Sequence, residues 1–506
     1  MTVHAVINLD LPGPVISRHI YGHFAEHLGR CIYGGLWVGE DSPIPNIRGL
    51  RRDVIEALRA IAIPNLRWPG GCFADTYHWR DGIGPRDQRP RMVNSHWGDV
   101  VEDNSFGTHE FMDLCELLGA APYISGNLGS GTVREMGEWI EYLTRADDSP
   151  IAALRRTNGR DEPWRVPFWG IGNETWGCGG NLNAETYAQL ARQFATFVRD
   201  HADNEVYRIA VGPQDDDYRW TDALMRSFGD LARESTMPAG PFQAISLHYY
   251  TMTGPWADKG SATAFTPDEW YLALARARRL DGYLTRHVAI MDHHDPYAKV
   301  GLAVDEWGTW WNVEPGTDPS FLYQQNTLRD ALVASLHFDM FHRHARRVMM
   351  ANIAQTANVL QAMVLTDPDT GALVRTPTYH VFAMNTGHHD AASLVVHLKD
   401  VPHIPVDGTE LPLVSASAST TGDSALISLS HMDTSMPCTV VLDLRGRPVI
   451  GHRARVLTAP DLNGHNTPAA PDVVAPADHE AVRPHARGLE VDLPPHAYVT
   501  VELTLA

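Results

Sequence analysis

Hydrophobic and polar positions alternate in two different ways along the chain, and the change falls near residue 384. Between about residues 18 and 383, short apolar runs rich in β-branched and aromatic residues alternate with longer amphipathic stretches. This arrangement is typical of repeated strand–helix units that build a parallel sheet. Eight runs are candidate strands: HIYGHF (19–24), IPNLRW (63–68), APYISG (121–126), VPFWGIG (166–172), YRIAVG (207–212), QAISLHY (243–249), GLAVDEW (301–307) and RVMMANI (347–353).

The stretches between these runs have the periodicity of helices. After Asn183, a suitable N-cap, one face collects the residues Tyr187, Leu190, Ala191, Phe194 and Val198. The same pattern predicts helices over 266–284 and 322–344. Eight such units in roughly 360 residues predict an α/β fold of the (β/α)8 TIM barrel type. A doubly wound sheet fits less well, because no G-x-G-x-x-G follows the first strand.

The last part of the chain has strand periodicity instead. SLVVHLKD, SALISLSH, CTVVLDLRG and AYVTVELTL are separated by turn-forming residues, which predicts a small all-β sandwich of jelly-roll-like type. The opening TVHAVINLD alternates in the same way, so we expect it to join the C-terminal sheet. The predicted division is therefore an N-terminal strand packing on the sandwich (1–17), a catalytic barrel (18–383) and the sandwich (384–506). Within the last, the proline-rich segment 466–484 is predicted to be a surface loop.

Composition excludes several classes of function. The chain carries 41 Lys and Arg against 61 Asp and Glu, a formal charge of −20, which opposes binding to nucleic acid or to an anionic membrane. No segment approaches the roughly 18 apolar residues that span a bilayer, and the start lacks the pattern of a signal peptide, so we expect a cytoplasmic protein. The 26 histidines, MDHHDP (291–296) among them, form no H-E-x-x-H or other ligand spacing. We therefore predict neither a metal ion nor a cofactor.

Polar residues gather where the predicted strands end, which is the catalytic rim of a TIM barrel. They are Glu26 after strand one, Arg67 at the end of strand two, Asn173 and Glu174 after strand four, His248 and Tyr250 at strand six, Glu306 at strand seven, and Gln355 after strand eight. A single exposed acid is ordinarily a solvated loop residue. Two acids on different strands, each embedded in Trp and Gly as in GIGNETWG and VDEWGTWW, favour a sugar-binding pocket. Each Trp of WGTWW (307–311) either stacks on a sugar or packs under the loops.

Two carboxylates without a metal ion or a phosphate loop indicate glycoside cleavage. One carboxyl group, kept protonated, gives its proton to the leaving oxygen, and the other, kept ionised, attacks the anomeric carbon. These tasks need different pKa values, and a nearby cation such as Arg67 would favour the ionised form of the nucleophile.

Several long motifs carry a family resemblance. YGHFAEHLGRCIYGGLW, LRWPGGCFADTYHWRDGIGP, FGTHEFMDLC, WGIGNETWGCGG, ISLHYYT, VDEWGTWW, ANIAQTANVLQ and the closing LPPHAYVTVEL resemble the α-L-arabinofuranosidases of glycoside hydrolase family 51 over nearly the whole chain. The resemblance implies a (β/α)8 barrel with a C-terminal β-sandwich, retaining hydrolysis of arabinofuranosyl oligosaccharides by an exo-acting enzyme, and a homo-oligomer, often a hexamer.

The resemblance also implies residue roles. Glu174 matches the acid/base and Glu306 the nucleophile, while Asn173 matches the residue that holds the sugar 2-hydroxyl. Glu26 and Arg67 match residues that bind the arabinose hydroxyls and orient the nucleophile. Gln355 and Tyr250 match further sugar contacts, with Tyr249 as a rival to Tyr250 because the motif reads HYY.

One position departs from many family members, which have Asn where this chain has Cys72. A thiol cannot replace the paired donor and acceptor of an amide, so one sugar hydrogen bond must be absent or made otherwise. Cys178 follows Glu174 closely, and a disulfide from it to Cys72 is an alternative. The five cysteines include no C-x-x-C pair and the expected compartment is reducing, so we predict free thiols.

Three rival functions remain open at this point. A β-xylosidase or another furanosidase would use the same chemistry, since loop contacts alone decide which ring fits. A sugar-binding protein without hydrolytic activity would keep the pocket, although both carboxylates are present here. A metal-dependent TIM-barrel hydrolase would depend on the histidines and lose activity with a chelator.

Overall fold

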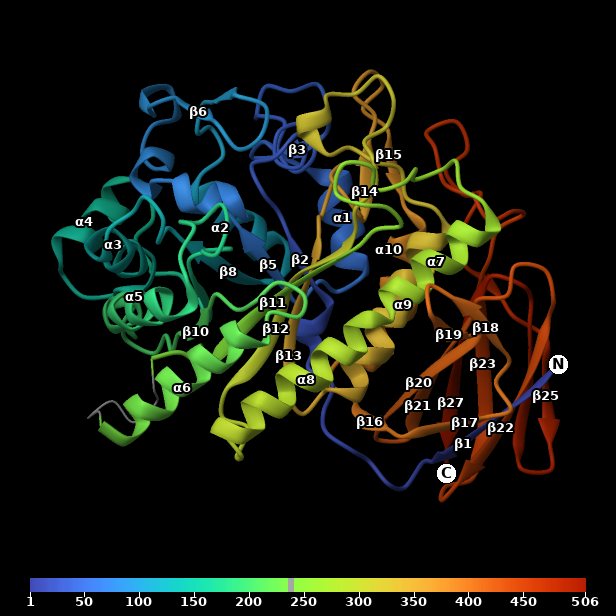
Figure 1. The fold of residues 1–506 in the computed structure, drawn as a ribbon. Helices are drawn as coiled ribbons and strands as arrows, with labels where there is room; N and C mark the ends of the chain where they lie inside the picture. The colour runs from blue at the N-terminus through green and yellow to red at the C-terminus, as the bar shows by residue number, and fades with distance from the viewer. Residues whose placement is uncertain (235–240) are drawn as a thin grey trace.

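The computed structural model describes residues 1–234 and 241–506, and within them the chain forms a closed parallel barrel followed by a β domain (Figure 1). Each barrel strand pairs with the next one in the sequence, and the last pairs with the first. The predicted fold class is therefore confirmed. The barrel strands are β2 (Gly22–Phe24), β5 (Asn65–Trp68), β8 (Ala121–Gly126), β9 (Phe168–Ile171), β10 (Tyr207–Ala210), β11 (Ala244–Thr251), β12 (Gly301–Thr309) and β13 (Val348–Ala354).

Each predicted strand segment overlaps one of these strands, with differences at the ends. The largest is at 19–24, where residues up to Tyr21 belong to the 3-10 helix η1 (Arg18–Tyr21) and only the last three are extended. The Ser17 side chain accepts a hydrogen bond from the backbone N–H of His19 at the start of this helix. The 3-10 helix and the strand are both apolar, so the sequence pattern predicted one continuous strand where the structure has two elements.

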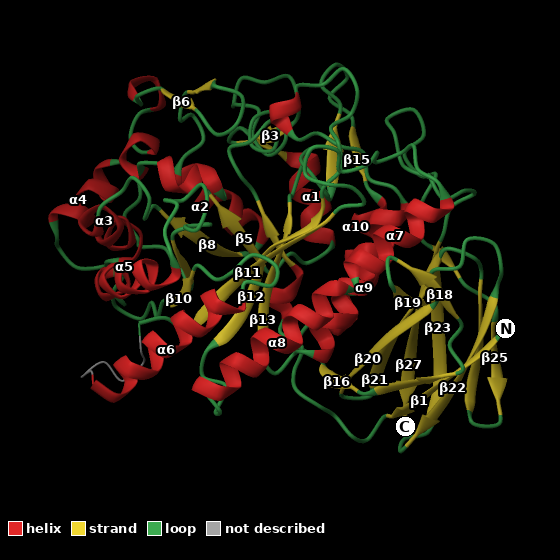
Figure 2. Cartoon of the chain, viewed as in Figure 1, coloured by secondary structure: helices red, strands yellow, loops and turns green. Residues whose placement is uncertain are grey.

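Helices cover the outside of the barrel, as the red ribbons of Figure 2 show. The predicted helix after Asn183 is confirmed, because the Asn183 side chain accepts from the N–H of Thr186 and caps α5. The helices are α1 (Arg52–Ala60), α2 (Thr108–Leu118), α3 (Val133–Thr144), α4 (Pro150–Thr157), α5 (Ala184–Phe197), α6 (Tyr218–Glu234), α7 (Pro267–Ala277), α8 (Arg279–His294), α9 (Leu328–Arg343) and α10 (Pro377–Met384).

Two helix predictions were wrong in extent. The segment 266–284 is not one helix, because α7 ends at Ala277 and α8 continues from Arg279 to His294. Arg278 between them keeps nearly helical dihedral angles (φ −69°, ψ −15°), so the side-chain periodicity runs through the break. The helix predicted over 322–344 starts only at Leu328, where Thr327 and Asp330 form a reciprocal capping box.

Two sheets form the C-terminal domain, and their strands pair antiparallel except for β1 (Thr2–Asn8) and β22 (Cys438–Arg445), which run parallel. In the first, β1 lies between β17 (Val396–Lys399) and β22, so the prediction that the N-terminal strand joins this domain is confirmed. This sheet also holds β26 (Gly488–Leu493) and β25 (Val482–His485). The second holds β16 (Ala392–Leu394), β20 (Val414–Thr421), β21 (Ser424–His431), β27 (Ala497–Leu505), β23 (Val449–Leu457) and β24 (Ala477–Asp478).

The segment 466–484 is not entirely a loop, because it contributes β24 and the start of β25. Short two-stranded sheets lie outside the two main ones: β3 (Asn46–Ile47) with β4 (Leu50–Arg51), β6 (Met92–Asn94) with β7 (Val100–Glu102), β14 (Val364–Thr366) with β15 (Leu373–Arg375), and β18 (His403–Val406) with β19 (Thr409–Pro412). The predicted domain boundaries at residues 17 and 383 stay a prediction.

The barrel has a packed interior that supports its upper rim. Six strands contribute to one buried cluster, formed by Tyr123, Phe168, Ile209, Ala244, Ala303 and Met350. Tyr123 also donates a hydrogen bond from its hydroxyl to Asp305 at 2.6 Å. The barrel floor thereby fixes a carboxylate next to Glu306. Among the described residues, no helix is long and apolar enough to cross a bilayer.

Candidate active site

The predicted rim residues meet at one end of the barrel. A cavity of about 380 Å³ is lined by Glu26, Cys72, Glu174, Tyr250, Glu306 and Gln355, together with Leu28, Trp97, Trp176, Cys178, Gln214, Trp256, Trp310, Leu322 and Leu360. Arg67 and His248 are buried and contact Glu306 and Glu174 from behind, and the buried Asn173 accepts a hydrogen bond from Arg67. The structure therefore brings all nine predicted site residues together.

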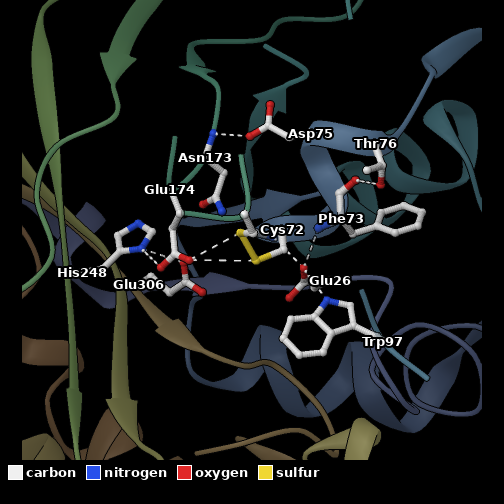
Figure 3. Close-up of a disulfide and its surroundings, with 12 residues drawn as sticks. Glu26, Cys72, Phe73, Asp75, Thr76, Trp97, Asn173, Glu174, His248 and Glu306 are labelled. Carbon is white, nitrogen blue, oxygen red and sulfur yellow. Dashed lines mark hydrogen bonds and ion pairs between the residues drawn. A yellow bond between two sulfur atoms is a disulfide. The ribbon is translucent and has the colours of Figure 1, made fainter. Parts of the chain in front are cut away.

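The two glutamates face each other across His248 (Figure 3). One oxygen of Glu174, one of Glu306 and a ring nitrogen of His248 all lie within 4.8 Å of one another. His248 Nδ1 is 2.8 Å from Glu174 Oε1 and 2.9 Å from Glu306 Oε2. Because Nδ1 carries at most one hydrogen, it cannot fully satisfy two ionised carboxylates. The geometry favours one ionised and one protonated glutamate.

His248 is held in its charged form. Its burial acts to lower its pKa, but the charge of Glu306 and the close contacts with the carboxyl groups of Asp305, Glu174 and Glu306 outweigh burial and raise the pKa well above the ordinary value. The second ring nitrogen, Nε2, lies 3.2 Å from Asp305 Oδ1. An imidazolium with an acid on each side is the expected state at neutral pH.

Glu306 is surrounded by groups that favour its anion. Burial acts to raise its pKa, yet the charge and hydrogen bond of His248, the charge of Arg67 and the hydrogen bond from Tyr250 together lower it. Arg67 Nη1 lies 3.5 Å from Glu306 Oε2, and the Tyr250 hydroxyl donates to Glu306 Oε1 at 3.0 Å. Tyr249, the rival in the HYY motif, donates instead to the backbone carbonyl of Arg276. Of the two tyrosines, Tyr250 is the one at the site.

Glu174 has the opposite environment. Burial and then the negative charge of Glu306 raise its pKa, against the weaker opposing effects of His248 and Arg67. Its backbone lies in the left-handed region (φ 40°), where the turn is closed by hydrogen bonds from the N–H groups of Gly177 and Gly179 to the Glu174 carbonyl. This sharp turn after β9 directs the carboxyl group into the cavity.

Arg67 and Asp75 hold the turn before Glu174 in place. Arg67 Nη2 donates to Asn173 Oδ1 at 2.5 Å, and Asp75 Oδ2 accepts from the backbone N–H of Asn173 at 2.9 Å. Burial raises the pKa of Asp75 to about 7, although it also accepts from the N–H groups of Leu128 and Gly129. Asn173 Nδ2 is left buried with no hydrogen-bond partner in the described part of the protein. This donor is available to a hydroxyl of a bound sugar.

Glu26 is the centre of a second polar group on the other wall. Its Oε1 accepts hydrogen bonds from the backbone N–H of Gly71 and Phe73 and from Trp97 Nε1, each between 3.0 and 3.1 Å. Its Oε2 accepts from Gln355 Nε2 at 3.0 Å. Burial, followed by the charge of Glu306, nevertheless raises the pKa of Glu26 to about 7. Gly71 therefore supplies one of the backbone donors that hold this carboxylate.

Cys72 and Cys178 form a disulfide, so the prediction of free thiols was wrong for these two residues. Their Cα atoms lie 5.5 Å apart across 106 residues of sequence. The ends of nearby barrel strands bring these distant segments together. The prediction of free thiols assumed a reducing compartment and did not take this proximity into account. Cys31, Cys115 and Cys438 are free and buried.

The tryptophans of WGTWW divide between the two roles considered for them. Trp307 and Trp311 are buried under the loops, whereas Trp310 lines the cavity. The Trp310 ring packs edge-on against Tyr250 at 5.0 Å and against Trp256 at 4.7 Å between centroids. Trp256 is 60% exposed, so an aromatic surface extends from the cavity to its mouth.

Asp305, Asp75 and Trp97 were missed on the sequence. Strict strand alternation would direct Asp305 away from the side to which Glu306 points, but the pairing of β12 shifts register on both of its neighbours near this point. Such irregularities re-aim side chains, so both acids reach the site. Asp305 could have been proposed from the sequence, because it directly precedes the predicted catalytic Glu306 in VDEW. Nothing in the sequence indicated the hydrogen bond between Trp97 and Glu26.

The histidine-rich MDHHDP segment lies at the end of α8 rather than at the site. His294 Nε2 is 2.9 Å from Asp222 Oδ1, and no member of this segment belongs to a group of three metal-ligating side chains in residues 1–234 and 241–506. In the part of the chain that the structure describes, such groups occur only around Glu174, with Cys72 and Cys178 or with His248 and Glu306. The first pair is joined in a disulfide, and the second group contains the candidate catalytic pair.

Comparison with known proteins gives consistent matches over the whole chain. Residues 57–253 match the family described as Alpha-L-arabinofuranosidase 1 domain, and residues 305–497 match Alpha-L-arabinofuranosidase C-terminal domain. An intracellular exo-α-L-arabinofuranosidase of Bacteroides ovatus is 48% identical over 99% of this chain and 95% of its own length.

Solved structures give the same result. The crystal structure of the GH51 arabinofuranosidase from Xanthomonas axonopodis pv. citri is 49% identical, covers 99% of this chain and 100% of its own, and superposes with a TM-score of 0.95. An α-L-arabinofuranosidase from Thermotoga maritima, solved as an arabinose complex, is 32% identical over 99% of this chain and 100% of its own, with a TM-score of 0.83.

Proposed function

Because this chain belongs to the α-L-arabinofuranosidases of glycoside hydrolase family 51, we propose that it releases terminal arabinofuranosyl units from oligosaccharides by double displacement. In this mechanism Glu306 is the nucleophile and Glu174 is the acid/base. The product would keep the anomeric configuration of the substrate.

The separation of the two carboxyl groups carries this proposal. Retaining glycosidases have their two carboxyl groups about 5 to 5.5 Å apart, and inverting enzymes about 6.5 to 9.5 Å, to leave room for a water molecule. Oxygens of Glu174 and Glu306 lie within 4.8 Å of each other, on the side of the retaining class.

The first step uses the contrast between the two environments. Glu306, held ionised by His248, Arg67 and Tyr250, attacks the anomeric carbon. Glu174, whose pKa is raised, gives its proton to the leaving oxygen. The products are an arabinosyl ester of Glu306 and the shortened alcohol.

The second step follows from the loss of one charge. Once Glu306 is esterified, the negative charge that helps to raise the pKa of Glu174 is gone, while His248 and Arg67 remain. The pKa of Glu174 then falls, so its carboxylate can take a proton from water that attacks the ester. The same residue serves as acid and as base because its neighbour changes charge.

The cavity suits a single terminal sugar ring. Asn173 Nδ2 and Gln355 Oε1 are buried polar atoms without a protein partner among the described residues, and they offer one donor and one acceptor to sugar hydroxyls. The intracellular relative from Bacteroides ovatus is described as exo-acting, which supports removal of end units here. Its description also supports the proposal of a location inside the cell. A homo-oligomer, as the family resemblance implies, remains a proposal.

Aryl α-L-arabinofuranosides test the catalytic assignment. Glu306→Ala should abolish turnover, and added azide should restore it with a product of inverted configuration, identified by NMR. Glu174→Ala should keep activity only on substrates with good leaving groups. Inverted configuration of the product of the unaltered enzyme, or hydrolysis by Glu306→Ala without azide, would contradict the proposal. Aryl β-xylosides and other furanosides, measured alongside, determine which ring the site prefers.

A further inference from the structure

The disulfide between Cys72 and Cys178 connects two loops of the active site. Cys72 starts the 3-10 helix η2 (Cys72–Thr76) after β5, and Cys178 lies in the loop after β9 that also carries Glu174. Figure 3 shows the sulfur atoms beside the Glu174 carboxyl group. Cys178 is exposed and Cys72 is half-buried, so small molecules in solution can reach the bond.

Both sulfur atoms contact one oxygen of the candidate acid. Glu174 Oε2 lies 3.9 Å from Cys72 Sγ and 3.6 Å from Cys178 Sγ, while Oε1 is occupied by His248. A disulfide sulfur carries no hydrogen, so these contacts offer the carboxyl group no donor. Two thiols at the same distances would offer one each.

We propose that the Cys72–Cys178 disulfide is a positioning element for Glu174, which fixes the acid/base loop and withholds hydrogen-bond donors from its free oxygen. Opening the disulfide would then weaken Glu174 as a general acid. The proposal rests on the catalytic assignment of Glu174 given above.

Opening requires a reductant, for which a small dithiol is sufficient. A thiolate of the dithiol attacks Sγ of Cys178, and the Cys72 thiolate leaves and takes up a proton. The second thiolate of the dithiol then attacks the mixed disulfide, which releases Cys178 as a thiol and the dithiol as a cyclic disulfide. Two electrons and two protons pass to the protein, and the reductant loses them.

The expected change in titration has a definite sign. The groups that face Glu174 are His248 and Tyr250 from β11, Glu306 from β12, Arg67 from β5, Asp215 after β10 and the two cysteines. Reduction changes the cysteines alone. A new donor favours the anion of Glu174 and lowers its pKa, so the protonated acid is lost at a lower pH.

Reduction of the unaltered enzyme by dithiothreitol provides the first test. The alkaline limb of kcat/KM should move down by about one pH unit for a substrate with a poor leaving group such as the phenyl arabinofuranoside. At pH values above that limb the activity should fall roughly tenfold. A dinitrophenyl substrate, which needs no proton from Glu174 to leave, should show less than a twofold change.

Two double variants separate the two proposed roles of the disulfide, which are to fix the loop of Glu174 and to withhold hydrogen-bond donors from its carboxyl group. Cys72→Ser with Cys178→Ser places hydroxyl donors near Glu174 and should reproduce the shifted limb without a reductant. Cys72→Ala with Cys178→Ala removes both tether and donor, so it should lower kcat through a less ordered loop and leave the limb in place. Neither double variant should respond to dithiothreitol, whereas Cys438→Ala, which changes a free buried thiol in β22, should respond like the unaltered enzyme.

Two results would overturn the proposal. One is a reduced enzyme, with opening proved by thiol labelling and folding by circular dichroism, whose pH profile is unchanged on the phenyl substrate. The other is an equal loss on both substrates with no shift of the limb, which a purely structural bond would give. If instead Glu174→Ala loses no activity on the phenyl substrate, the proposed function itself fails, so the two failures are distinguishable.

Discussion

At the scale of single residues, Asp305 determines how the catalytic charges are balanced. It is buried, accepts from the Tyr123 hydroxyl at 2.6 Å, and lies 3.2 Å from His248 Nε2 and 3.7 Å from Arg67 Nε. Burial acts to raise its pKa, but Arg67 and His248 lower it overall. Asp305 is therefore an anion that supports the two cations next to Glu306, without touching the cavity itself.

Replacing Asp305 with Asn tests this positioning role. The amide keeps the shape but removes the charge, so the pKa of His248 should fall and Glu306 should lose part of its stabilisation. One pKa unit corresponds to about 1.4 kcal/mol of lost stabilisation of the Glu306 anion, so we expect the acid limb of kcat/KM, which reports ionisation of Glu306, to move up by about one pH unit. Below that limb kcat/KM should fall roughly tenfold. The measurement is a pH profile of kcat/KM on an aryl arabinofuranoside.

Asp339→Asn is the matched control for Asp305→Asn. Asp339 is equally buried, in α9, where it accepts a hydrogen bond from Ser415 of the β domain at 2.5 Å, and burial raises its pKa to about 6. Its replacement should leave the pH profile unchanged. If Asp305→Asn behaves like this control, Asp305 has only a structural role.

The sequence predicted the site residues that lie in strand motifs, but not those that reach the site from irregular loops. Glu174 and Glu306 could be found because each follows or ends an apolar strand and lies in Trp- and Gly-rich sequence. Trp97 could not, because it reaches Glu26 from a loop between short strands that carry no periodic signal. The Cys72–Cys178 pair depends on the meeting of two strand ends 106 residues apart, which no local pattern encodes.

At the scale of elements, the loops after the barrel strands extend the binding surface from the catalytic residues to the mouth of the cavity. The loop after β11 places Trp256 at the mouth of the cavity, where Lys259 Nζ lies 4.5 Å from the centre of its ring. Together with Trp310 this ring forms an aromatic wall at the mouth, next to Tyr250. Such a surface is suited to stack on the next sugar of an oligosaccharide rather than on the terminal one.

Trp256→Ala should therefore separate long substrates from short ones. We expect KM for an arabino-oligosaccharide to rise roughly fivefold, about 1 kcal/mol of lost stacking, while kinetics on methyl α-L-arabinofuranoside stay unchanged. Tyr297→Ala, which removes an aromatic ring that is 83% exposed just before β12, is the control and should change neither substrate. Equal effects of Trp256→Ala on both substrates would refute a role in binding beyond the terminal sugar.

Element boundaries were harder to predict than element types, for reasons that the structure makes clear. The α7–α8 break escaped detection because Arg278 remains close to helical dihedral angles. Tertiary contacts accompany the break: Trp270 of α7 donates to the backbone of Met432 in the β domain, whereas His287 of α8 bonds Thr221 of α6. The start of α9 was visible in principle, since Thr327 and Asp330 have the spacing of a capping box.

At the scale of the whole molecule, the junction between barrel and β domain is built from buried polar side chains. His342 of α9 lies 2.7 Å from the Tyr21 hydroxyl and 3.0 Å from Ser417 Oγ, and Ser335 Oγ lies 2.8 Å from Ser430 Oγ. His388 lies between Ser419 and Ser428, at 2.7 and 2.8 Å from their hydroxyls. The hydrogen bonds of His342 and Ser335 join α9 to the β domain, and the His388 ring, inside that domain, packs against His342 at 4.7 Å between centroids.

Burial lowers the pKa of His388 to about 3 and that of His342 well below the ordinary value. An unfolded histidine binds its proton near pH 6.5, so the stability that these groups contribute is present above that pH and is lost as the pH falls toward the folded pKa. At pH 5, each would lower the free energy of unfolding by about 2 kcal/mol relative to pH 7.5. Asp339 in the same junction opposes this trend, since its folded pKa of about 6 favours the protonated folded state below that pH.

Comparing variants in urea at pH 7.5 and pH 5.0 isolates the histidine contribution, because the effect of Asp339 is common to all of them. His388→Gln should lose about 2 kcal/mol less stability on acidification than the unaltered protein, although it is less stable at pH 7.5. His397→Gln, on an exposed position of β17, should show the full loss and serves as the control. If His388→Gln and His397→Gln lose the same stability on acidification, the buried junction histidine does not set the acid sensitivity. In that case the acid limit would have to come from buried histidines of the barrel, such as His23 and His337, whose pKa values burial lowers to about 3.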